Sequence, residues 1–419
     1  MSEVRVAVVG GGVVGLACAW ELRRAGADVI VLERATVGGG VSRGNTGWVC
    51  PSMTYPLPAP GMVREGLRQL VTGGEAFVLR PTLDPSFVRW LWHFRRNCTQ
   101  ARFDAGVRAL LGLNRRTLEL FDAYRAAGVE FEMHTAGLVV AARTAEGLDL
   151  YRAIFARLRQ LGYDGGTIGE LDGKEAAAIE PALDADKVVA GLRAVVDRFV
   201  RPESLTAGLA ASLRADGVEI REGCELRELH RRNGSLDIDT GGEPVRADRV
   251  VIAAGLPSGP LLKRCGVRVP LVGARGYSVT LPGRGTPPSH ALYLAEAKLG
   301  LSPYDGGVRI AGVFELGASS TDASADVGAR LIAASRPYLG GWQPDSETPV
   351  DAWAGLRPAT PDGLPLVGAL PGIDGAFVAT GHGMLGVTLA PATAAALAPL
   401  VLEGRAADEL APFDPARRL

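Results

Sequence analysis

The chain has 419 residues, of which 47% are hydrophobic and 22% are charged, a composition typical of a globular protein long enough for two domains. The 45 Lys and Arg residues nearly balance the 46 Asp and Glu residues, for a formal net charge of −1, which argues against a nucleic-acid-binding surface. The five cysteines are scattered and form no C-x-x-C pair, so we expect free thiols in a reducing compartment and no metal site.

The N-terminal stretch has the parts of a dinucleotide-binding turn. An apolar, β-branched run at 4–9 is followed by Gly10, Gly12 and Gly15 at G-x-G-x-x-G spacing, and then by an Ala- and Leu-rich helical segment at 16–22. The first glycine permits a tight turn, the second lets the backbone approach a pyrophosphate, and the third lets the helix pack closely on the strand. The sequence therefore predicts a nucleotide at this helix N-terminus.

A second predicted strand, 28–32, ends in Glu33, an acidic residue at the position that can bind a ribose hydroxyl. The loop 38–51 that follows is rich in small and polar residues. Such a loop can follow a bound cofactor closely and supply N–H donors, although an ordinary surface loop is the alternative. Up to this point NAD and FAD fit the sequence equally well.

The middle of the chain alternates helical and strand patterns. Between 87 and 96, aromatic residues are mixed with arginines, which fits either a helix lying on a membrane surface or a helix packed on the protein body. Periodicity predicts helices at 106–127, 150–161 and 204–215, and strands at 137–142, 218–220, 236–239 and 248–255. Predicted strands at 277–281 and 308–311, with a hairpin turn at 304–307, indicate an antiparallel sheet between 270 and 316.

The C-terminal part carries a second dense cluster of motifs. The block 353–368 precedes a predicted strand at 376–380, the loop 381–386 and a helix at 388–402. The stretch 375–402 lacks Asp, Glu, Lys and Arg and could span a membrane by length. Because it contains Gly381-His382-Gly383, Pro391 and Pro399, we predict a strand, a glycine loop and a buried helix instead.

These blocks together resemble the FAD-dependent oxidoreductases of the D-amino-acid oxidase superfamily, most closely the D-amino-acid dehydrogenases, over nearly the whole chain. The resemblance rests on the N-terminal glycine motif and on Ser42-Arg43-Gly44-Asn45-Thr46-Gly47, Asn97-Cys98, Gly276-Tyr277-Ser278, Gly355-Leu356-Arg357-Pro358, Thr360-Pro361-Asp362-Gly363 and Gly381-His382-Gly383. It implies an α/β fold with a Rossmann-type, glutathione-reductase-like FAD-binding domain and an α+β substrate domain built on an antiparallel sheet. The expected boundaries are 1–57, 190–262 and 345–419 for the FAD-binding domain, and 58–189 and 263–344 for the substrate-binding domain.

The resemblance also implies which residues contact FAD, from the pyrophosphate and adenosine end to the flavin ring. They are Gly10, Gly12, Val13, Val14, Gly15, Glu33, Arg34, Ser42, Asn45, Thr46, Gly47, Leu226, Ala253, Ala254, Gly255, Gly355, Gly381, Met384, Leu385 and Gly386. Relatives with covalent flavin carry cysteine where this chain has Gly355, so non-covalent FAD is expected. Relatives that act on glycine or sarcosine place an arginine where this chain has Met384.

Three side chains are expected to act at the substrate. Relatives bind the substrate carboxylate with the arginine of the Gly-Leu-Arg-Pro block, here Arg357, and a bidentate arginine suits that task. Tyr277 is expected to donate to the same carboxylate or cap the pocket, with a packing role as the alternative. His382 is expected to support the flavin by hydrogen bonding rather than to act as a base.

The implied activity is oxidation of a D-amino acid or a cyclic imino acid of the proline or hydroxyproline type, by hydride transfer from Cα to flavin N5. The product is an imine and then usually a 2-oxo acid, and the electrons pass to an acceptor other than oxygen, such as a quinone or the respiratory chain. An oxidase of secondary or N-methylated amines that produces hydrogen peroxide is one alternative. A membrane-associated electron-transfer or docking protein is another, and an NAD-linked dehydrogenase is the last.

The location expected from the sequence is the cytoplasm, because Met1-Ser2-Glu3 lacks the basic region of a signal peptide. Peripheral contact with the inner face of the cell membrane is left open by the aromatic and arginine residues between 87 and 96.

Overall fold

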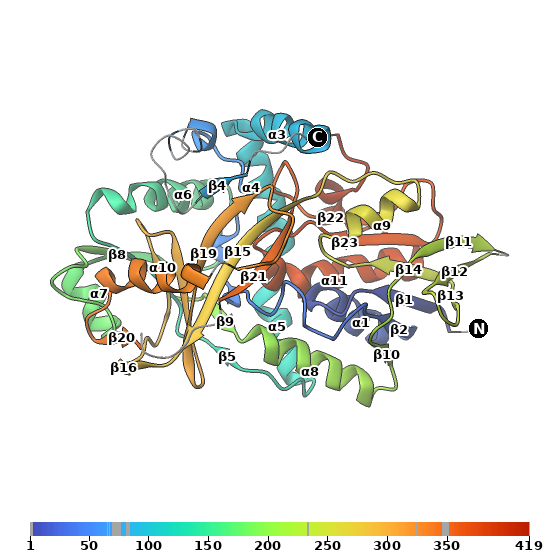
Figure 1. Ribbon diagram of the computed structural model, residues 1–419, viewed down its shortest axis with the longest axis horizontal. Coiled ribbons are helices and arrows are strands. Elements are labelled where there is room, and N and C mark those ends of the chain that lie inside the picture. Colours follow the sequence, from blue (N-terminus) through green and yellow to red (C-terminus); the bar gives the residue numbers. More distant parts are fainter. Residues whose placement is uncertain are drawn as a thin grey trace.

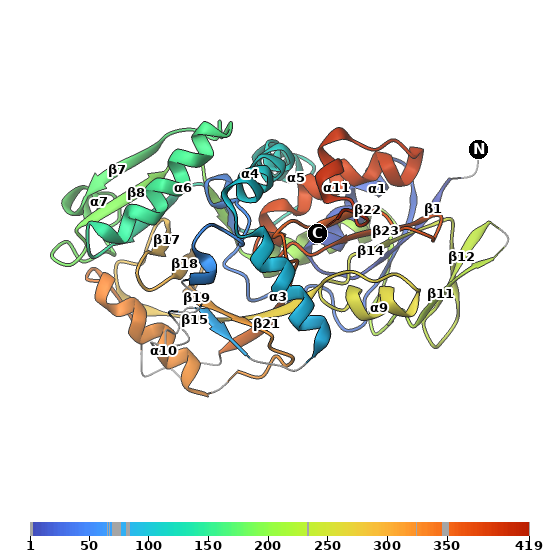
Figure 2. The same ribbon diagram turned by 90° about the horizontal axis from the view of Figure 1, so that it is seen from above.

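The structure, a computed structural model, describes residues 3–64, 66, 68, 77–80, 84–232, 234–323, 325–345 and 352–418. A parallel sheet occupies the right-hand side of Figure 1, and a larger, mainly antiparallel sheet extends from the centre to the left. The view in Figure 2 shows the same division along the long axis of the molecule.

The first sheet is the nucleotide-binding type that the N-terminal motif predicts. Its order is β10 (Glu219–Arg221), β2 (Asp28–Leu32), β1 (Arg5–Val9), β14 (Arg249–Ile252), β23 (Ala376–Thr380) and β22 (Leu366–Ala369). The pairs are parallel except for β22 with β23. The strands are apolar on both faces, as Val6, Ala7 and Val8 show with 0% exposure, because both faces are covered.

Different layers cover the two faces of this sheet. Helices α1 (Val13–Arg24), α8 (Pro202–Ala215) and α11 (Gly386–Glu403) cover one face. The antiparallel meander of β11 (Glu228–Arg232), β12 (Ser235–Asp239) and β13 (Val245–Ala247), together with α9 (Ser258–Arg264), covers the other. The buried C-terminal helix is confirmed: α11 is apolar enough to cross a membrane by composition, but 67% of its 18-residue window lies buried inside the protein.

The second sheet contains the predicted antiparallel strands. Its order is β21 (Trp353–Ala359), β15 (Val272–Leu281), β19 (Gly307–Leu316), β18 (Leu299–Tyr304), β17 (Ala291–Leu294), β6 (Leu138–Ala142), β8 (Ala190–Ala194) and β7 (Ile168–Asp172), with β4 (Phe77–Leu79) beside β19. The predicted hairpin is confirmed, since Asp305 and Gly306 join β18 to β19. Strands β8 and β21 lie in this sheet although the expected domain boundaries assign their residues to the FAD-binding domain; those boundaries stay a prediction.

Smaller elements complete the fold. Helices α6 (Asp149–Gln160), α7 (Gly173–Ile179) and α10 (Ala325–Ser335) accompany the second sheet (Figure 1). Short strands form two further sheets, β3 (Trp48–Val49) with β9 (Arg198–Val200) and β5 (Met133–His134), and β16 (Gly283–Gly285) with β20 (Trp342–Pro344).

The prediction of one helix over 106–127 is wrong. The chain forms α4 (Gln100–Asn114) and α5 (Thr117–Ala126), with a break at Arg115 and Arg116. The buried Asn114 side chain donates to Thr54 Oγ1 at 3.1 Å. Arg116 then leaves helical geometry with φ −100° and ψ 5°. Continuous apolar periodicity across the break concealed it from the sequence pattern.

Helix α3 (Pro85–Asn97) contains the aromatic and arginine residues of the predicted membrane or packing segment. Its buried residues Phe87, Trp90 and Phe94 pack on strands of the second sheet. Trp90 Nε1 also donates to the Ala359 carbonyl at 3.2 Å. One face of the helix therefore packs on the protein body, whereas Val88 and Trp92 on the other face are exposed.

Replacing the two tryptophans of α3 separates the roles of its faces. We expect Trp90→Ala to lower the free energy of unfolding by about 3 to 5 kcal/mol, because a buried ring and its hydrogen bond are lost. Trp92→Ala, at a position 51% exposed, should change it by less than about 0.5 kcal/mol. Denaturant unfolding followed by fluorescence measures both; equal losses would contradict this packing.

Candidate active site

The glycine motif forms the tight turn between β1 and α1. Gly10 has φ +114°, and its N–H donates to the Leu32 carbonyl at 2.8 Å. A Cβ on Gly10 would lie 2.6 Å from the Ala253 carbonyl oxygen, and one on Gly15 would lie 1.9 Å from the Gly10 oxygen. Only glycine fits both places, so the backbone itself lines this end of the sheet.

Charged and small groups surround the start of α1. The Glu33 carboxylate accepts the Gly11 N–H at 2.7 Å and the Ala35 N–H at 2.9 Å, which fixes it beside the turn. Helix α1 has no acidic residue in its first turn, so the helix itself places no negative charge where an anion would meet its N-terminus. The adjacent strand β14 leads into Ala253, Ala254 and Gly255 at the same edge, whereas Arg34 is exposed and Leu226 is buried under the meander.

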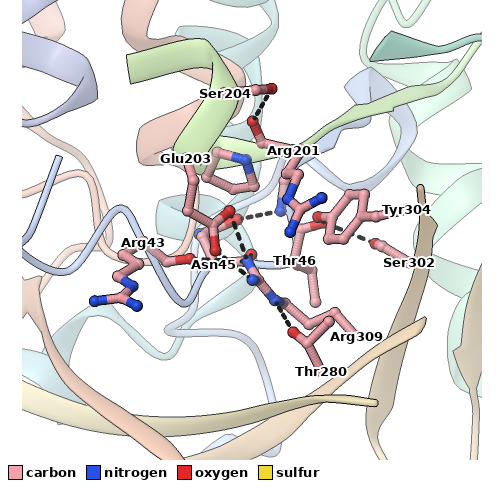
Figure 3. A network of polar contacts seen from close by, with 12 residues as sticks. Arg43, Asn45, Thr46, Arg201, Glu203, Ser204, Thr280, Ser302, Tyr304 and Arg309 are labelled. Carbon is pink, nitrogen blue, oxygen red and sulfur yellow. Dashed lines mark hydrogen bonds and ion pairs between the residues drawn. The ribbon is translucent and has the colours of Figure 1, made fainter. Parts of the chain in front are cut away.

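The loop with Ser42, Asn45, Thr46 and Gly47 lies between the first turn of α1 and the second sheet. Ser42 Oγ accepts the Val13 N–H at 3.2 Å, and Asn45 Oδ1 accepts the Gly47 N–H at 2.7 Å. On the other side, side chains of β18 and β19 bind the backbone carbonyls of this loop (Figure 3). The structure thus brings the predicted loop to the glycine turn.

Arg309, in β19, is the central member of this network, and the sequence did not predict it or the members Thr280, Glu203 and Ser302 (Figure 3). It is 5% exposed, donates to the Arg43 and Asn45 carbonyls at 2.8 Å each, and forms an ion pair with Glu203. Because arginine is frequent in this chain, an arginine at position 309 did not by itself indicate a functional role. A charged residue within the apolar run 308–311 was the clue that could have found it.

Arg357 lies on β21 opposite Ala274 of β15. Its guanidinium covers Gly276, where a Cβ would lie 1.9 Å from Nη1. Nη1 donates to the Val313 carbonyl at 3.2 Å, and the carbon of the guanidinium lies 5.9 Å from the Phe314 ring centroid. Burial lowers the pKa of Arg357 to about 10. In the part of the chain that the structure describes, no carboxylate pairs with this cation.

A β-bulge presents the Val313 carbonyl to Arg357. The register of β15 and β19 shifts between Arg275 and Tyr277, and Val313 has φ +62°. A β-branched residue in the left-handed region is a true outlier that the surrounding structure must hold in place. Bulges commonly re-aim groups beside active sites, so this strain supports the importance of the Arg357 position.

Tyr277 and Arg357 are not brought together. Arg357 shares a sheet face with Gly276, so the neighbouring Tyr277 faces the opposite side. Its hydroxyl donates to Glu315 at 2.8 Å, and Arg275 Nε also bonds this carboxylate, at 2.7 Å. Burial raises the pKa of Tyr277 to about 12. A direct contact of Tyr277 with the substrate stays a prediction; the geometry favours the packing alternative.

The two C-terminal motif blocks meet at His382. Ala359 and His382 form an isolated antiparallel bridge, and the Gly383 N–H donates to the Pro358 carbonyl at 3.0 Å. The His382 ring is buried, with Nε2 3.1 Å from Thr393 Oγ1. Burial lowers the pKa of His382 to about 4, so the imidazole is neutral and suited to a supporting role.

Helix α11 begins directly after this glycine loop. Leu385 is its N-cap, no side chain caps it, and its first turn holds no acidic residue. Gly386 is the first helical residue, Gly381 has φ +78°, and Met384 is 48% exposed. This is a second helix N-terminus free to meet an electron-rich oxygen.

These features fit FAD. The Gly10 turn and α1 suit a pyrophosphate, and Glu33 suits a ribose. The N-terminus of α11, at the other end, suits the pyrimidine edge of a flavin whose reduced form is negatively charged. Arg357, on a sheet face that includes Gly276 and Gly355, adds a cation that lacks a carboxylate partner among the described residues.

The chain belongs to the FAD dependent oxidoreductase family (DAO), which it matches over residues 5–400. It is therefore an FAD-dependent oxidoreductase. It is 32% identical over 411 residues to a D-amino acid dehydrogenase of Cereibacter sphaeroides, covering 96% of this chain and 92% of that one. It is 31% identical over 415 residues to a D-amino acid dehydrogenase of Phenylobacterium zucineum, and the match covers 97% of this chain and 95% of that one.

Solved structures share the fold. Glycine oxidase from Geobacillus kaustophilus has a TM-score of 0.76 at 23% identity and 100% coverage of both chains. L-proline dehydrogenase from P. horikoshii has a TM-score of 0.71 at 18% identity, covering 99% of this chain and 98% of that one. The predicted fold class, a Rossmann-type FAD-binding domain with a further sheet domain, is confirmed.

Gly15→Ala tests the glycine turn. Because the new Cβ would overlap the Gly10 oxygen, we expect loss of FAD from the purified protein and a lower melting temperature. Gly112→Ala is the control: its Cβ would meet nothing within 4 Å, and in a helix it should stabilise by about 0.5 to 1 kcal/mol. Full flavin content in Gly15→Ala would refute the predicted turn.

Glu315→Gln tests the cluster behind Tyr277. Arg275, Arg80 and Tyr277 bind this carboxylate and, against the opposing effect of burial, lower its pKa to about 2. Because the pKa of Glu315 is lower in the folded protein than in the unfolded chain, the ionised carboxylate stabilises the wild type above pH about 4.5. This stabilisation is lost as the pH falls toward 2. Melting temperatures should therefore show a lower neutral-pH stability and a flatter acid dependence for Glu315→Gln; parallel curves for the two proteins would contradict this.

Proposed function

We propose that this protein oxidises the Cα–N bond of a D-amino acid or a cyclic imino acid of the proline type, with Arg357 holding the substrate carboxylate. The observation that carries the proposal is the partly buried Arg357 guanidinium, which has a backbone carbonyl but no carboxylate partner among the described residues. The identity to proteins named D-amino acid dehydrogenase, at 32% over 96% of the chain, supports the D configuration.

FAD supplies the chemistry as the acceptor of the hydride. The protein's own part is positioning. A buried arginine can bind a carboxylate with two parallel hydrogen bonds, which fixes the distance and direction of the substrate Cα. The neighbouring Gly276 and Gly355 leave room on the sheet face for the Arg357 guanidinium and the Trp353 indole, which cover them. The neutral His382 offers no competing positive charge there.

The proposed FAD contacts remain those that the sequence predicts, from Gly10 to Gly386, and we propose that FAD is bound non-covalently. A Cβ at Gly355 would lie 2.0 Å from Trp353 Cη2. Position 355 therefore has no room for the cysteine that covalent relatives carry unless the indole moves. Release of yellow FAD from acid-denatured protein into the supernatant would support this; flavin that stays with the precipitate would contradict it.

Anaerobic addition of both enantiomers of a set of amino and imino acids tests the function. A D-amino acid or imino acid should bleach the flavin absorption; if none does, the substrate class is wrong. Hydrogen peroxide formation as fast as dye reduction would favour the alternative, an oxidase of secondary or N-methylated amines. Slow peroxide formation with fast dye reduction supports a quinone or respiratory chain as the electron acceptor.

Arg357→Met should lower kcat/KM for carboxylate substrates by the equivalent of about 2 to 5 kcal/mol, since a buried charge pair is lost. Arg357→Lys keeps the charge but loses the bidentate geometry and should recover only part of the activity. Arg268→Met, at an exposed position, is the control. Steady-state kinetics with a dye acceptor measure all three; unchanged kinetics in Arg357→Met would remove this residue from the site.

We also propose a cytoplasmic location with peripheral membrane contact through α3. Val88 and Trp92 are 55% and 51% exposed, and the Arg96 guanidinium lies 4.5 Å from the Trp92 ring. Exposed Arg89 and Arg95 add positive charge to the same helix, which suits an anionic lipid surface.

Co-sedimentation with phosphatidylglycerol vesicles tests this contact. The wild type should sediment with the vesicles at low salt, because an aromatic and cationic helix face binds anionic lipid. Trp92→Ala should sediment less, with the same melting temperature as the wild type. A wild type that stays in the supernatant would exclude α3 as a membrane contact.

A further inference from the structure

Arg309 is a buried cation in the second sheet, and most of its hydrogen bonds go to the 43–46 loop and to α8 of the first sheet's covering layer. Its side chain is 6% exposed, although Val308 and Ile310 beside it are apolar core residues. Its Nε donates to Thr280 Oγ1 at 2.9 Å on the neighbouring strand. Burying a charge here is costly unless its hydrogen bonds are satisfied, and each of the three guanidinium nitrogens of Arg309 has an acceptor.

Those partners are backbone carbonyls of the loop predicted to line FAD. Nη1 of Arg309 donates to the Arg43 and Asn45 carbonyls at 2.8 Å each. Ser302 and Tyr304, from β18, donate their hydroxyls to the next carbonyl, that of Thr46, at 2.7 and 2.6 Å. Figure 3 shows these side chains converging on the loop from the sheet below and beside it.

Capture of these carbonyls fixes the direction of the following N–H groups. In a trans peptide the C=O and the next N–H point in opposite directions. With the carbonyls of residues 43 and 45 turned to Arg309, the N–H groups of Gly44 and Thr46 point away from it. Neither of these N–H groups donates to an acceptor in the described part of the chain. They are two donors without a partner among the described residues.

Glu203 holds the Arg309 fork in this orientation. It lies in the first turn of α8, with Oε1 2.5 Å from Nη2 and Oε2 3.4 Å from Nη1. The ion pair neutralises the buried cation and ties α8, which packs on the first sheet, to β19 of the second. Only a planar fork can bond Thr280, two carbonyls and a carboxylate at once, so lysine cannot replace it.

We propose that Arg309, oriented by Glu203, is a positioning residue for FAD: it turns the 43–46 loop so that the Gly44 and Thr46 N–H groups donate to oxygen atoms of the cofactor. Arg309 does not itself contact the cofactor or the substrate in this account. The inference rests on the proposed placement of FAD along the 42–47 loop, and it is independent of which amine the enzyme oxidises.

Binding of FAD to apoprotein, followed by quenching of flavin fluorescence, tests this role without any substrate. Arg309→Lys keeps the charge for Glu203 but loses the fork. We expect FAD to bind at least about tenfold more weakly, because charge-assisted hydrogen bonds that orient the loop are lost. The visible absorption bands of the bound flavin should also shift, which a change in overall stability alone would not cause.

Arg201→Lys is the matched control. Arg201 lies over the same Tyr304 ring, at 5.9 Å, but donates to the Asp305 carbonyl instead of the 43–46 loop. The Arg201→Lys variant should therefore bind FAD with wild-type affinity and show the wild-type flavin spectrum. Tyr304→Phe, which removes one hydroxyl, serves as the second test variant if Arg309→Lys does not fold; it should weaken FAD binding in the same direction by a smaller factor.

Wild-type FAD affinity and spectrum in Arg309→Lys, or in Tyr304→Phe where Arg309→Lys does not fold, would overturn the proposal. Equal weakening in Arg201→Lys would overturn it too, since the effect would then not depend on the loop. A wild type that binds FAD but is bleached by no amine would contradict the proposed function and leave this result standing. The two failures are therefore distinguishable.

Discussion

The constraint on which the rest of the site depends is the partly buried Arg357 guanidinium, which has no carboxylate partner among the described residues. Moving an arginine out of water costs free energy that a single backbone carbonyl repays only in part. Arg357 has the Val313 carbonyl as an acceptor and lies over the Phe314 ring, 5.9 Å from its centroid. A ligand carboxylate would complete the set of hydrogen bonds, which is why we propose this position as the substrate-binding site.

The rest of the second sheet keeps that guanidinium in place. Gly276 leaves room beneath it, and the β-bulge with Val313 at φ +62° turns a carbonyl toward it. The bridge between Ala359 and His382 then joins the strand of Arg357 to the glycine loop before α11. The proposed substrate anchor and the loop proposed to meet the flavin are consequently joined through this bridge, while the Arg309 network holds the 43–46 loop.

The sequence allowed the nucleotide-binding turn, the buried C-terminal helix and the antiparallel hairpin to be predicted, because each depends on local pattern. Gly10, Gly15 and Glu33 lie where the fingerprint expects them.

The sheet face toward which the Tyr277 side chain points could not be predicted, since it depends on the strand register of β15 with β21. The bulge at Val313 carries no local signature, and the break at Arg116 depends on the distant contact of Asn114 with Thr54. Arg309 was hidden because arginine is common in this chain, and its partners come from three separate segments.

The most direct test of the central claim is single-turnover reduction of the enzyme-bound flavin, without oxygen, by an amino acid and by the amine that lacks only its carboxylate. If Arg357 binds the carboxylate, the amino acid that the enzyme prefers should reduce the flavin at low concentration, and the decarboxylated amine should need concentrations at least about a hundredfold higher, since a buried charge pair is absent. Equal concentration dependence for the two compounds would contradict the account.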